Sequence, residues 1–447
     1  MKVLIVYEVR VREIDSALLL KTALEMRGYE VKIVDKNSMF RMKYRDCIIV
    51  VPNSYHTLDY QTYNYTLNAK NNHIINLQYE QVYSKSTEEK GYMIPKGKAK
   101  KEHFICWGPY TYNKLTRIGL KSSQLSVTGA LQLDFLRPEF SSFWRSKEEI
   151  SHQYNIPLDK EWLLYISSFS YVNNTRYIKN AINEIGAGDH KSIKEMERVS
   201  NESHKITLEW FEKLIEENEN FIMIYRPHPM EASHPQLKKI QEKFPENFYV
   251  ISDLNVKQWI TISDQVFTWI STSITESFFA KKMCHILRPI PIPEDLDPRI
   301  YEGTTNIIDT YQGLVNIVKR YNSTNNFIEE EFPINKDNIN RYYLWDDEAS
   351  YEKIINVIET IEVTEKQPIE KKYFLNRWKF LYKNNILRRF LFIKLYQFLH
   401  KNFDFKIKNE SFRKRYSVNK LEKQAKRQNK KELQEKEIKI KKILEKY

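Results

Sequence analysis

The stretch FIMIYRPHPME, residues 221–231, ends an apolar run in an arginine and a histidine held between two prolines. A short continuous apolar run is typical of a strand buried on both faces of a parallel sheet. Each proline fixes its own backbone angle and pushes the preceding residue toward an extended conformation. The sequence therefore predicts a buried strand that ends in a rigid polar corner, with His228 at its centre.

Short apolar runs of the same kind occur along most of the chain and alternate with segments of helical periodicity. Before residue 150 they cover residues 2–9, 29–35, 46–52, 73–79, 105–108 and 125–129, and after it 162–170, 248–252, 265–271 and 284–290. This alternation is typical of parallel sheets with helices on both faces. We expect an α/β protein with two Rossmann-like, doubly wound domains, residues 1–145 and 146–367, interrupted by an insertion or helical lid at 173–215. Such sheets bind ligands at the carboxyl ends of their strands.

The positive charge of the chain is concentrated at its C-terminus. The 447 residues carry a formal net charge of +13, but residues 368–447 hold 25 Lys and Arg against 8 Asp and Glu. The rest of the chain is close to neutral, which argues against a nucleic-acid-binding protein. The three cysteines, Cys47, Cys106 and Cys284, are isolated in sequence. This spacing indicates neither a disulfide framework nor a zinc site, and it fits the cytosol.

A second polar corner follows the apolar run at 265–270, as Ser-Thr-Ser before a predicted helix. The spacing Ser273-x-x-Glu276 is typical of a capping box, which alone indicates only the start of a helix. Hydroxyls and free amides at a helix start also suit an anion, and the fork of Arg226 suits a phosphate. We expect the two corners to lie on neighbouring strands and to form one nucleotide site. Glu276 would accept hydrogen bonds from the ribose there. The predicted nucleotide-binding residues are Arg226, His228, Ser271, Thr272, Ser273 and Glu276.

Carboxylates follow two predicted strands of the first domain. A hydroxyl that attacks a carbon centre needs a base to accept its proton. Glu13, after the first strand, and Glu80, after the run at 73–79, are the candidate bases, and His228 is a further catalytic candidate. Alternatively, Glu13 stabilises the start of the first helix and Glu80 is a solvated loop residue. Asp134 either lines the same site or caps a helix.

Motifs in a fixed order along the chain resemble bacterial surface-carbohydrate biosynthesis proteins. They are VREIDSALLLKTALEMRGYEV at 11–31, ICWGPYTYNKL at 105–115, SVTGALQLDFLRP at 126–138 and LLYISSFSYVNN at 163–174. YRPHP followed by a strand, STS and a helix resembles the His-Pro and Ser/Thr motifs of GT-B glycosyltransferases that use CMP-activated sugars, such as sialyltransferases and capsular Kdo transferases. The CDP-glycerol polymerases of teichoic acid synthesis are similar. The resemblance covers roughly residues 1–300.

The resemblance implies a GT-B fold, in which the two domains face a cleft. It also implies that His228 and the Ser-Thr-Ser loop contact the donor phosphate. The polymerases usually have an Asp-containing Ser-Ser loop here, so this sequence favours a CMP-linked sugar over CDP-glycerol. No P-loop or GxGxxG occurs, so neither ATP hydrolysis nor NAD is expected. Asp295 and Asp297 spell a DxD in a proline-rich loop, where we expect no metal.

These observations predict a metal-independent glycosyltransferase of bacterial surface polysaccharide synthesis with no cofactor. It would transfer a sugar such as Kdo or sialic acid from a CMP-linked or CDP-linked donor to a glycan or lipid-linked acceptor. A CDP-glycerol or CDP-ribitol phosphotransferase, a sugar-nucleotide epimerase and a non-catalytic scaffold of polysaccharide assembly are open alternatives. Inversion and retention of the anomeric centre are both open.

The C-terminal extension, residues 368–447, interleaves aromatic and basic residues. A basic amphipathic helix rich in aromatics is typical of binding to an anionic membrane surface. We expect residues 371–447 to hold a cytoplasmic enzyme on the inner face of the cell membrane, which suits a lipid-linked acceptor. The alternative is that the aromatics pack back on the two domains and the lysines are solvated. No run is long and apolar enough to span a bilayer.

Overall fold

The computed structural model describes residues 1–36, 47–66, 72–172, 174, 178, 190–231, 234–320, 327–361, 371–383, 395, 398 and 430–446. The first half contains β1 (Lys2–Tyr7), α1 (Arg10–Met26), β2 (Glu30–Asp35), β3 (Cys47–Val51), α2 (Thr57–Thr66), β4 (His73–Asn76), α3 (Lys85–Glu89), β5 (His103–Cys106), α4 (Pro109–Arg117), β6 (Leu125–Val127) and α5 (Lys147–Tyr154). The second half contains β7 (Glu161–Ile166), α7 (His190–Glu217), β8 (Phe221–Arg226), α8 (Pro235–Lys243), β9 (Phe248–Val250), α9 (Val256–Ile262), β10 (Gln265–Thr268), α10 (Ser273–Phe279), β11 (Cys284–Leu287), β12 (Ile307–Ile308), α11 (Tyr311–Arg320) and α12 (Lys336–Tyr342). The helices α13 (Ser350–Thr360), α14 (Lys371–Lys383) and α18 (Lys430–Leu444) follow. Short 3-10 turns lie at Gly97–Lys101, Ser122–Gln124, Leu131–Leu136, Pro138–Phe143, Arg299–Tyr301 and Glu329–Glu331.

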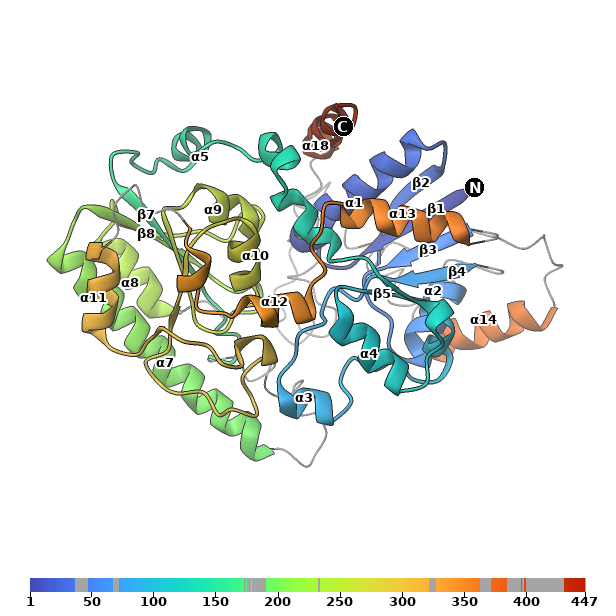
Figure 1. The fold of residues 1–447 in the computed structure, drawn as a ribbon, viewed down its shortest axis with the longest axis horizontal. Helices are drawn as coiled ribbons and strands as arrows, with labels where there is room; N and C mark the ends of the chain where they lie inside the picture. Colours follow the sequence, from blue (N-terminus) through green and yellow to red (C-terminus); the bar gives the residue numbers. More distant parts are fainter. Residues whose placement is uncertain are drawn as a thin grey trace.

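Each half builds one six-stranded parallel sheet. The strand order is β2-β1-β3-β4-β5-β6 in the first sheet and β12-β11-β10-β7-β8-β9 in the second. The order reverses between β1 and β3 in the first sheet and between β10 and β7 in the second, with helices flanking both (Figure 1). This architecture confirms the predicted α/β fold of GT-B type, with two doubly wound Rossmann-like halves. The predicted strands are all present, and β12 is an additional strand of two residues that the sequence did not predict.

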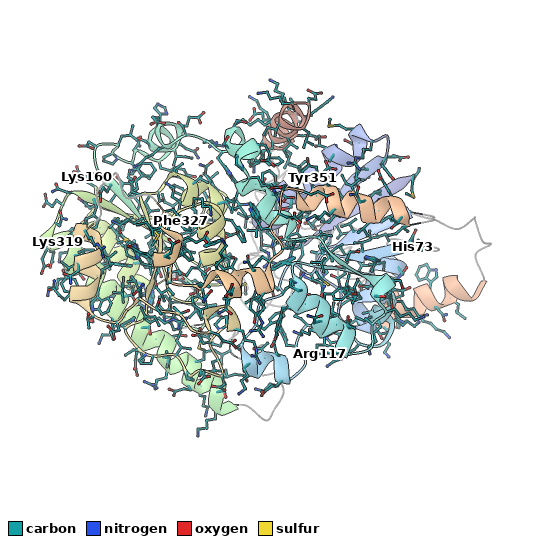
Figure 2. All side chains as sticks on the ribbon, viewed as in Figure 1. His73, Arg117, Lys160, Lys319, Phe327 and Tyr351 are labelled. Atoms are coloured by element: carbon teal, nitrogen blue, oxygen red, sulfur yellow. The ribbon has the colours of Figure 1, made fainter. Side chains whose placement is uncertain are left out.

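The chain returns to the first half after completing the second. In Figure 1 the orange helix α13 lies beside β1 and α1, and Figure 2 labels Tyr351 at its start. Ile354, Ile355 and Ile358 of α13 are fully buried in the core of the first sheet. The chain therefore crosses back before residue 367, where the predicted second domain ends.

Asp134 fixes the start of the returning helix. Its carboxylate accepts hydrogen bonds from the backbone N–H groups of Ser350 at 2.9 Å and Tyr351 at 2.7 Å. Arg137 Nε donates to the same carboxylate at 3.2 Å. Of the two interpretations of Asp134, the structure shows the helix cap. Gly129 makes room nearby, because a Cβ there would lie 2.7 Å from the Leu344 carbonyl oxygen.

Helix α7 belongs to the core of the second half rather than to a lid. It covers most of the predicted insertion, part of which lies outside the described residues. Its apolar side chains Val199, Leu208 and Phe211 are buried against the second sheet. This 28-residue helix is amphipathic and buries its apolar face in the core of the second half.

The C-terminal extension is helical where the structure describes it. Helix α18 packs on α1, with Ile440 and Ile443 buried in the first core, so this part of the extension folds back on the first half. It holds no aromatic residue, so the choice between membrane binding and packing of the aromatics stays a prediction. Helix α14 packs on α2 and exposes Trp378 and Tyr382. Most of residues 384–429 lie outside the described chain. Among the described residues, no helix has the length and apolar character that crossing a bilayer requires.

Candidate functional site

The two predicted polar corners lie at the carboxyl edge of the second sheet. The His-Pro corner follows β8 and the Ser-Thr-Ser loop follows β10, while the loop after β7 lies between them. The expectation that β8 and β10 are neighbours is wrong, because β7 pairs with both. The reversal of strand order between β10 and β7 is where doubly wound sheets open a ligand crevice.

His228 is held in one orientation and one tautomer. The Met230 N–H donates to His228 Nδ1 at 3.1 Å, so the neutral ring carries its proton on Nε2. Burial and, second, the Arg12 charge lower the His228 pKa to about 4. The ring is therefore neutral at pH 7, and its Nε2–H is a hydrogen-bond donor. With Nδ1 already accepting a bond, His228 has no free nitrogen lone pair to act as a base.

Glu231 closes the His-Pro corner, although its place in the quoted stretch gave no sign of a role. The Glu231 N–H donates to the His228 carbonyl oxygen at 2.8 Å, and the His228 N–H donates to Glu231 Oε2 at 3.0 Å. The carboxylate also accepts from the Ser167 hydroxyl at 2.5 Å and the Tyr225 hydroxyl at 2.7 Å. Burial raises the Glu231 pKa, and these donors oppose that rise. The spacing His-x-x-Glu, which parallels a capping box, was the available signal.

The guanidinium of Arg226 is bonded to backbone carbonyls. Its two terminal nitrogens donate to the carbonyl oxygens of Asp253 and Leu254, each at 2.5 Å. These bonds fix the loop between β9 and α9. A contact between Arg226 and a phosphate stays a prediction.

The Ser-Thr-Ser loop has a different geometry from the predicted capping box. Helix α10 begins at Ser273 after Thr272, and no side chain caps it. The Ser271 hydroxyl accepts from the Ser273 N–H at 3.2 Å, and the Ser271 N–H donates to the Thr268 hydroxyl at 3.3 Å. Within the described chain, the Thr272 N–H and hydroxyl have no hydrogen-bond partner. Thr272 thus offers both a backbone and a side-chain donor to a ligand, and within the described residues the hydroxyls of Ser271 and Ser273 donate no hydrogen bond either.

Glu276 is paired with a lysine instead of capping the helix. Its Oε1 lies 2.8 Å from Lys257 Nζ, and both side chains are largely buried. The pair joins α10 to α9, and burying a charge is tolerated because the opposite charge is adjacent. The predicted ribose contact of Glu276 stays a prediction.

Arg12 brings the two candidate bases of the first half together. Its NH1 donates to Glu80 Oε1 at 3.0 Å and its NH2 to Glu13 Oε1 at 3.2 Å. Glu13 is buried, which raises its pKa, and its Oε2 accepts from the Glu8 N–H at 2.6 Å. The side chain of Glu80 is 46% exposed, so it is the more accessible of the two carboxylates.

The two groups of residues face each other across the boundary between the halves. Arg12 lies close enough to His228 to lower its pKa. Nearby, Asn255 Nδ2 at the start of α9 donates to Asp15 Oδ2 of α1 at 3.2 Å. Lys436 of α18 donates to Asp15 Oδ1 at 2.7 Å. Asp15 therefore joins both halves and the C-terminal helix, a junction between residues too distant in sequence to be predicted.

Asp297 of the DxD motif forms an ion pair with Arg288. Arg288 donates to both oxygens of Asp297, at 2.6 and 2.8 Å. Among the described residues, no group of three or more His, Cys, Asp or Glu side chains is arranged to hold a metal ion.

Comparisons with known proteins give a structural likeness only. The sequence matches no family model and no curated protein. UDP-GlcNAc 2-epimerase from Methanocaldococcus jannaschii, with UDP-GlcNAc and UDP, is 14% identical with a TM-score of 0.48, covering 80% of this chain and 99% of that chain. A variant of the wall teichoic acid polymerase TagF is 12% identical with a TM-score of 0.49, covering 80% and 87%. S. aureus MnaA with UDP is 14% identical with a TM-score of 0.45, covering 83% and 100%. Similarity at this level says nothing about the reaction of this chain.

Proposed function

We propose that this chain is a glycosyltransferase of bacterial surface polysaccharide synthesis that uses a cytidine-nucleotide donor such as CMP-Kdo or CMP-sialic acid. One observation supports the transferase chemistry above the others. A neutral His228 with its Nε2–H available and the unpaired donors of Thr272 lie at the carboxyl edge of one sheet. Arg12, Glu13 and Glu80 lie across the boundary between the halves. The cytidine base and the class of sugar rest on the motif resemblance alone.

The residues divide the proposed reaction between the halves. As the bond from sugar to phosphate breaks, negative charge builds on the departing phosphate. The Nε2–H of His228 and the N–H and hydroxyl of Thr272 would stabilise that charge. Glu80 would accept the proton of the acceptor hydroxyl, and Arg12 would hold Glu80 in position. The acceptor is a glycan or a lipid-linked sugar in this proposal, and an anionic membrane surface binds the C-terminal extension.

The test is a binding and turnover screen on the purified full-length chain. We expect CMP or CDP to raise the unfolding midpoint more than UDP, GDP or ADP, because a ligand that binds only the folded state stabilises it. His228→Ala should lower turnover by about 100-fold, the scale of one lost transition-state donor. Glu80→Gln should lower turnover while nucleotide affinity stays unchanged.

Other outcomes identify the competing functions. Turnover of CDP-glycerol or CDP-ribitol without any CMP-sugar would identify a polyol phosphotransferase. Conversion of UDP-GlcNAc without an acceptor would identify an epimerase. If His228→Ala left polysaccharide output in cells unchanged while loss of residues 371–447 abolished it, the chain would be a scaffold.

A further inference from the structure

The loop after β7 connects the two phosphate-binding corners. Ser167 and Ser168 follow β7, which lies between β8 and β10. The Ser167 hydroxyl donates to Glu231 Oε2 at 2.5 Å, on the side of the His-Pro corner. The Ser168 hydroxyl accepts from the Ile270 N–H at 3.2 Å, on the side of the Ser-Thr-Ser loop. These two adjacent serines therefore contact both corners.

Glu231 is a buried anchor at one end of this connection. Its side chain is 2% exposed and accepts hydrogen bonds from Ser167, Tyr225 and the His228 N–H. A carboxylate that accepts several bonds inside the protein is fixed in position, because moving it would leave buried donors unpaired. The same turn places the Met230 N–H on His228 Nδ1 and so fixes the tautomer of the ring.

His204 of helix α7 lies next to the Glu231 side chain. His204 Nε2 lies 3.9 Å from Glu231 Oε1, and the His204 ring packs on Phe169, with ring centres 4.9 Å apart. His204 is 1% exposed, and burial, with a smaller contribution from His234, lowers its pKa to about 3. Glu231 therefore faces a neutral ring rather than a cation. The hydroxyls of Ser167 and Tyr225, not an ion pair, hold the Glu231 side chain in place.

We propose that Ser167, Ser168 and Glu231 form a positioning clamp that holds the His228 ring and the Thr272 loop at a fixed separation. The proposal rests on the proposed function, since the separation matters only if both corners bind one nucleotide. Two donors that contact the same phosphate group must keep their spacing, and a shift of about 1 Å costs a large factor in rate. Ser167, Ser168 and Glu231 are positioning residues in this proposal and do not touch the substrate.

The test separates the two ends of the clamp. Ring ¹⁵N NMR of His228 without nucleotide reports its tautomer, and calorimetry reports CMP affinity. Glu231→Ala and Ser167→Ala should mix the two tautomers and lower CMP affinity by about tenfold, the scale of a lost buried hydrogen bond. Ser168→Ala should lower CMP affinity to a similar extent and leave the tautomer unchanged. Ser168→Thr, which keeps the hydroxyl, should restore affinity.

Ser170→Ala is the matched control. Ser170 lies in the same loop and is buried, and its hydroxyl makes no hydrogen bond in the described chain. It should change neither the tautomer nor the affinity. If Glu231→Ala fails to fold, Glu231→Gln keeps the shape and tests the same bonds. An unchanged tautomer and unchanged affinity in the folded Glu231 variant would overturn the clamp. If the wild-type chain bound no nucleotide, the proposed function would fail, while the NMR arm would still decide whether Glu231 and Ser167 hold His228.

Discussion

Buried histidines make the stability of this chain depend on pH. Burial lowers the pKa of His204 to about 3 and that of His285 to about 4, from an ordinary value near 6.5. A group with a lowered folded pKa binds more protons in the unfolded state over that interval. The contribution of these histidines to the free energy of unfolding is therefore complete above about pH 6.5, and it is lost as the pH falls toward 4.

His204 provides the sharpest test of this dependence. We expect His204→Gln to unfold with a weaker pH dependence than the wild type between pH 6.5 and 4. A histidine whose pKa is lowered this far contributes on the order of 3–5 kcal/mol to the free energy of unfolding at a pH above its unfolded-state pKa. Urea unfolding at pH 7, 6, 5 and 4 measures it, with His152→Gln, a residue of the outer helix α5, as the control. Equal pH dependence in His204→Gln and the wild type would contradict the interpretation.

At the residue level, the sequence predicted the groups that carry their own local signal. His228, Glu13 and Glu80 follow their strands as expected, while their roles in binding and catalysis stay predictions. Glu231 was missed because its partners Ser167 and Tyr225 lie on other segments, and only the folded sheet brings them together. The capping box was wrong because Lys257, from another helix, pairs with Glu276.

Glycines allow the returning segment to reach the first half. Gly129 has a φ of +85°, and a Cβ there would lie 2.7 Å from the Leu344 carbonyl oxygen. Gly119 has nearly the same φ, +87°, with nothing within 4 Å of its Cβ position. We expect Gly129→Ala to be more destabilising than Gly119→Ala by about 1–3 kcal/mol, the cost of forcing an atom into a packed region. Chemical denaturation of the two variants compares them directly, and equal destabilisation would show that backbone conformation alone matters.

Helix α18 contributes to the first core through one face. Ile440 is fully buried, whereas Ile438, on the same helix, is 55% exposed. Ile440→Ala should lower the free energy of unfolding by about 2–4 kcal/mol, because it removes buried methyl groups and leaves a cavity. Ile438→Ala is the control and should change it by less than about 0.5 kcal/mol. If both variants unfold like the wild type, α18 is not docked in solution.

At the level of elements, the strands were predictable because each buried parallel strand is a continuous apolar run. The two residues of β12 are too short for such a signal. The packing partner of a helix was not predictable in the same way. The periodicity of α13 and α18 shows an apolar stripe but does not show which sheet the stripe covers. Contacts such as that of Asp134 with Ser350 decide this, and they join residues far apart in sequence.

The halves share buried residues, so the molecule should unfold as one unit. Trp107 and Leu133 of the first half lie in the same apolar cluster as Ile274 and Tyr343, and Trp107 stacks on Tyr343 with ring centres 5.4 Å apart. We expect tryptophan fluorescence and far-UV circular dichroism to report coincident urea transitions. Separate transitions would mean that each half is stable alone. The sequence indicated two domains but gave no sign of this common core.

The charge and the exposed aromatics of the C-terminal extension predict that the whole molecule binds an anionic membrane surface. Trp378 is 60% exposed and Tyr382 is 83% exposed on α14, while Leu381 is buried. Residues 368–447 carry the excess of Lys and Arg. We expect the chain to co-sediment with phosphatidylglycerol vesicles, and less so with neutral vesicles, since basic residues are attracted to an anionic surface.

Changing the salt concentration and removing the Trp378 side chain separate the electrostatic and the apolar contributions to membrane binding. Raising the salt from about 0.05 M to about 0.5 M should weaken partitioning at least tenfold, because the charges become screened. Trp378→Ala should weaken it by about tenfold at fixed salt, since the apolar ring no longer enters the interface. Leu158→Ala, which removes an exposed apolar side chain in the second half, should have no effect. Equal losses in the two variants, or partitioning that ignores salt, would show that α14 and its charged surroundings do not form the membrane-binding surface.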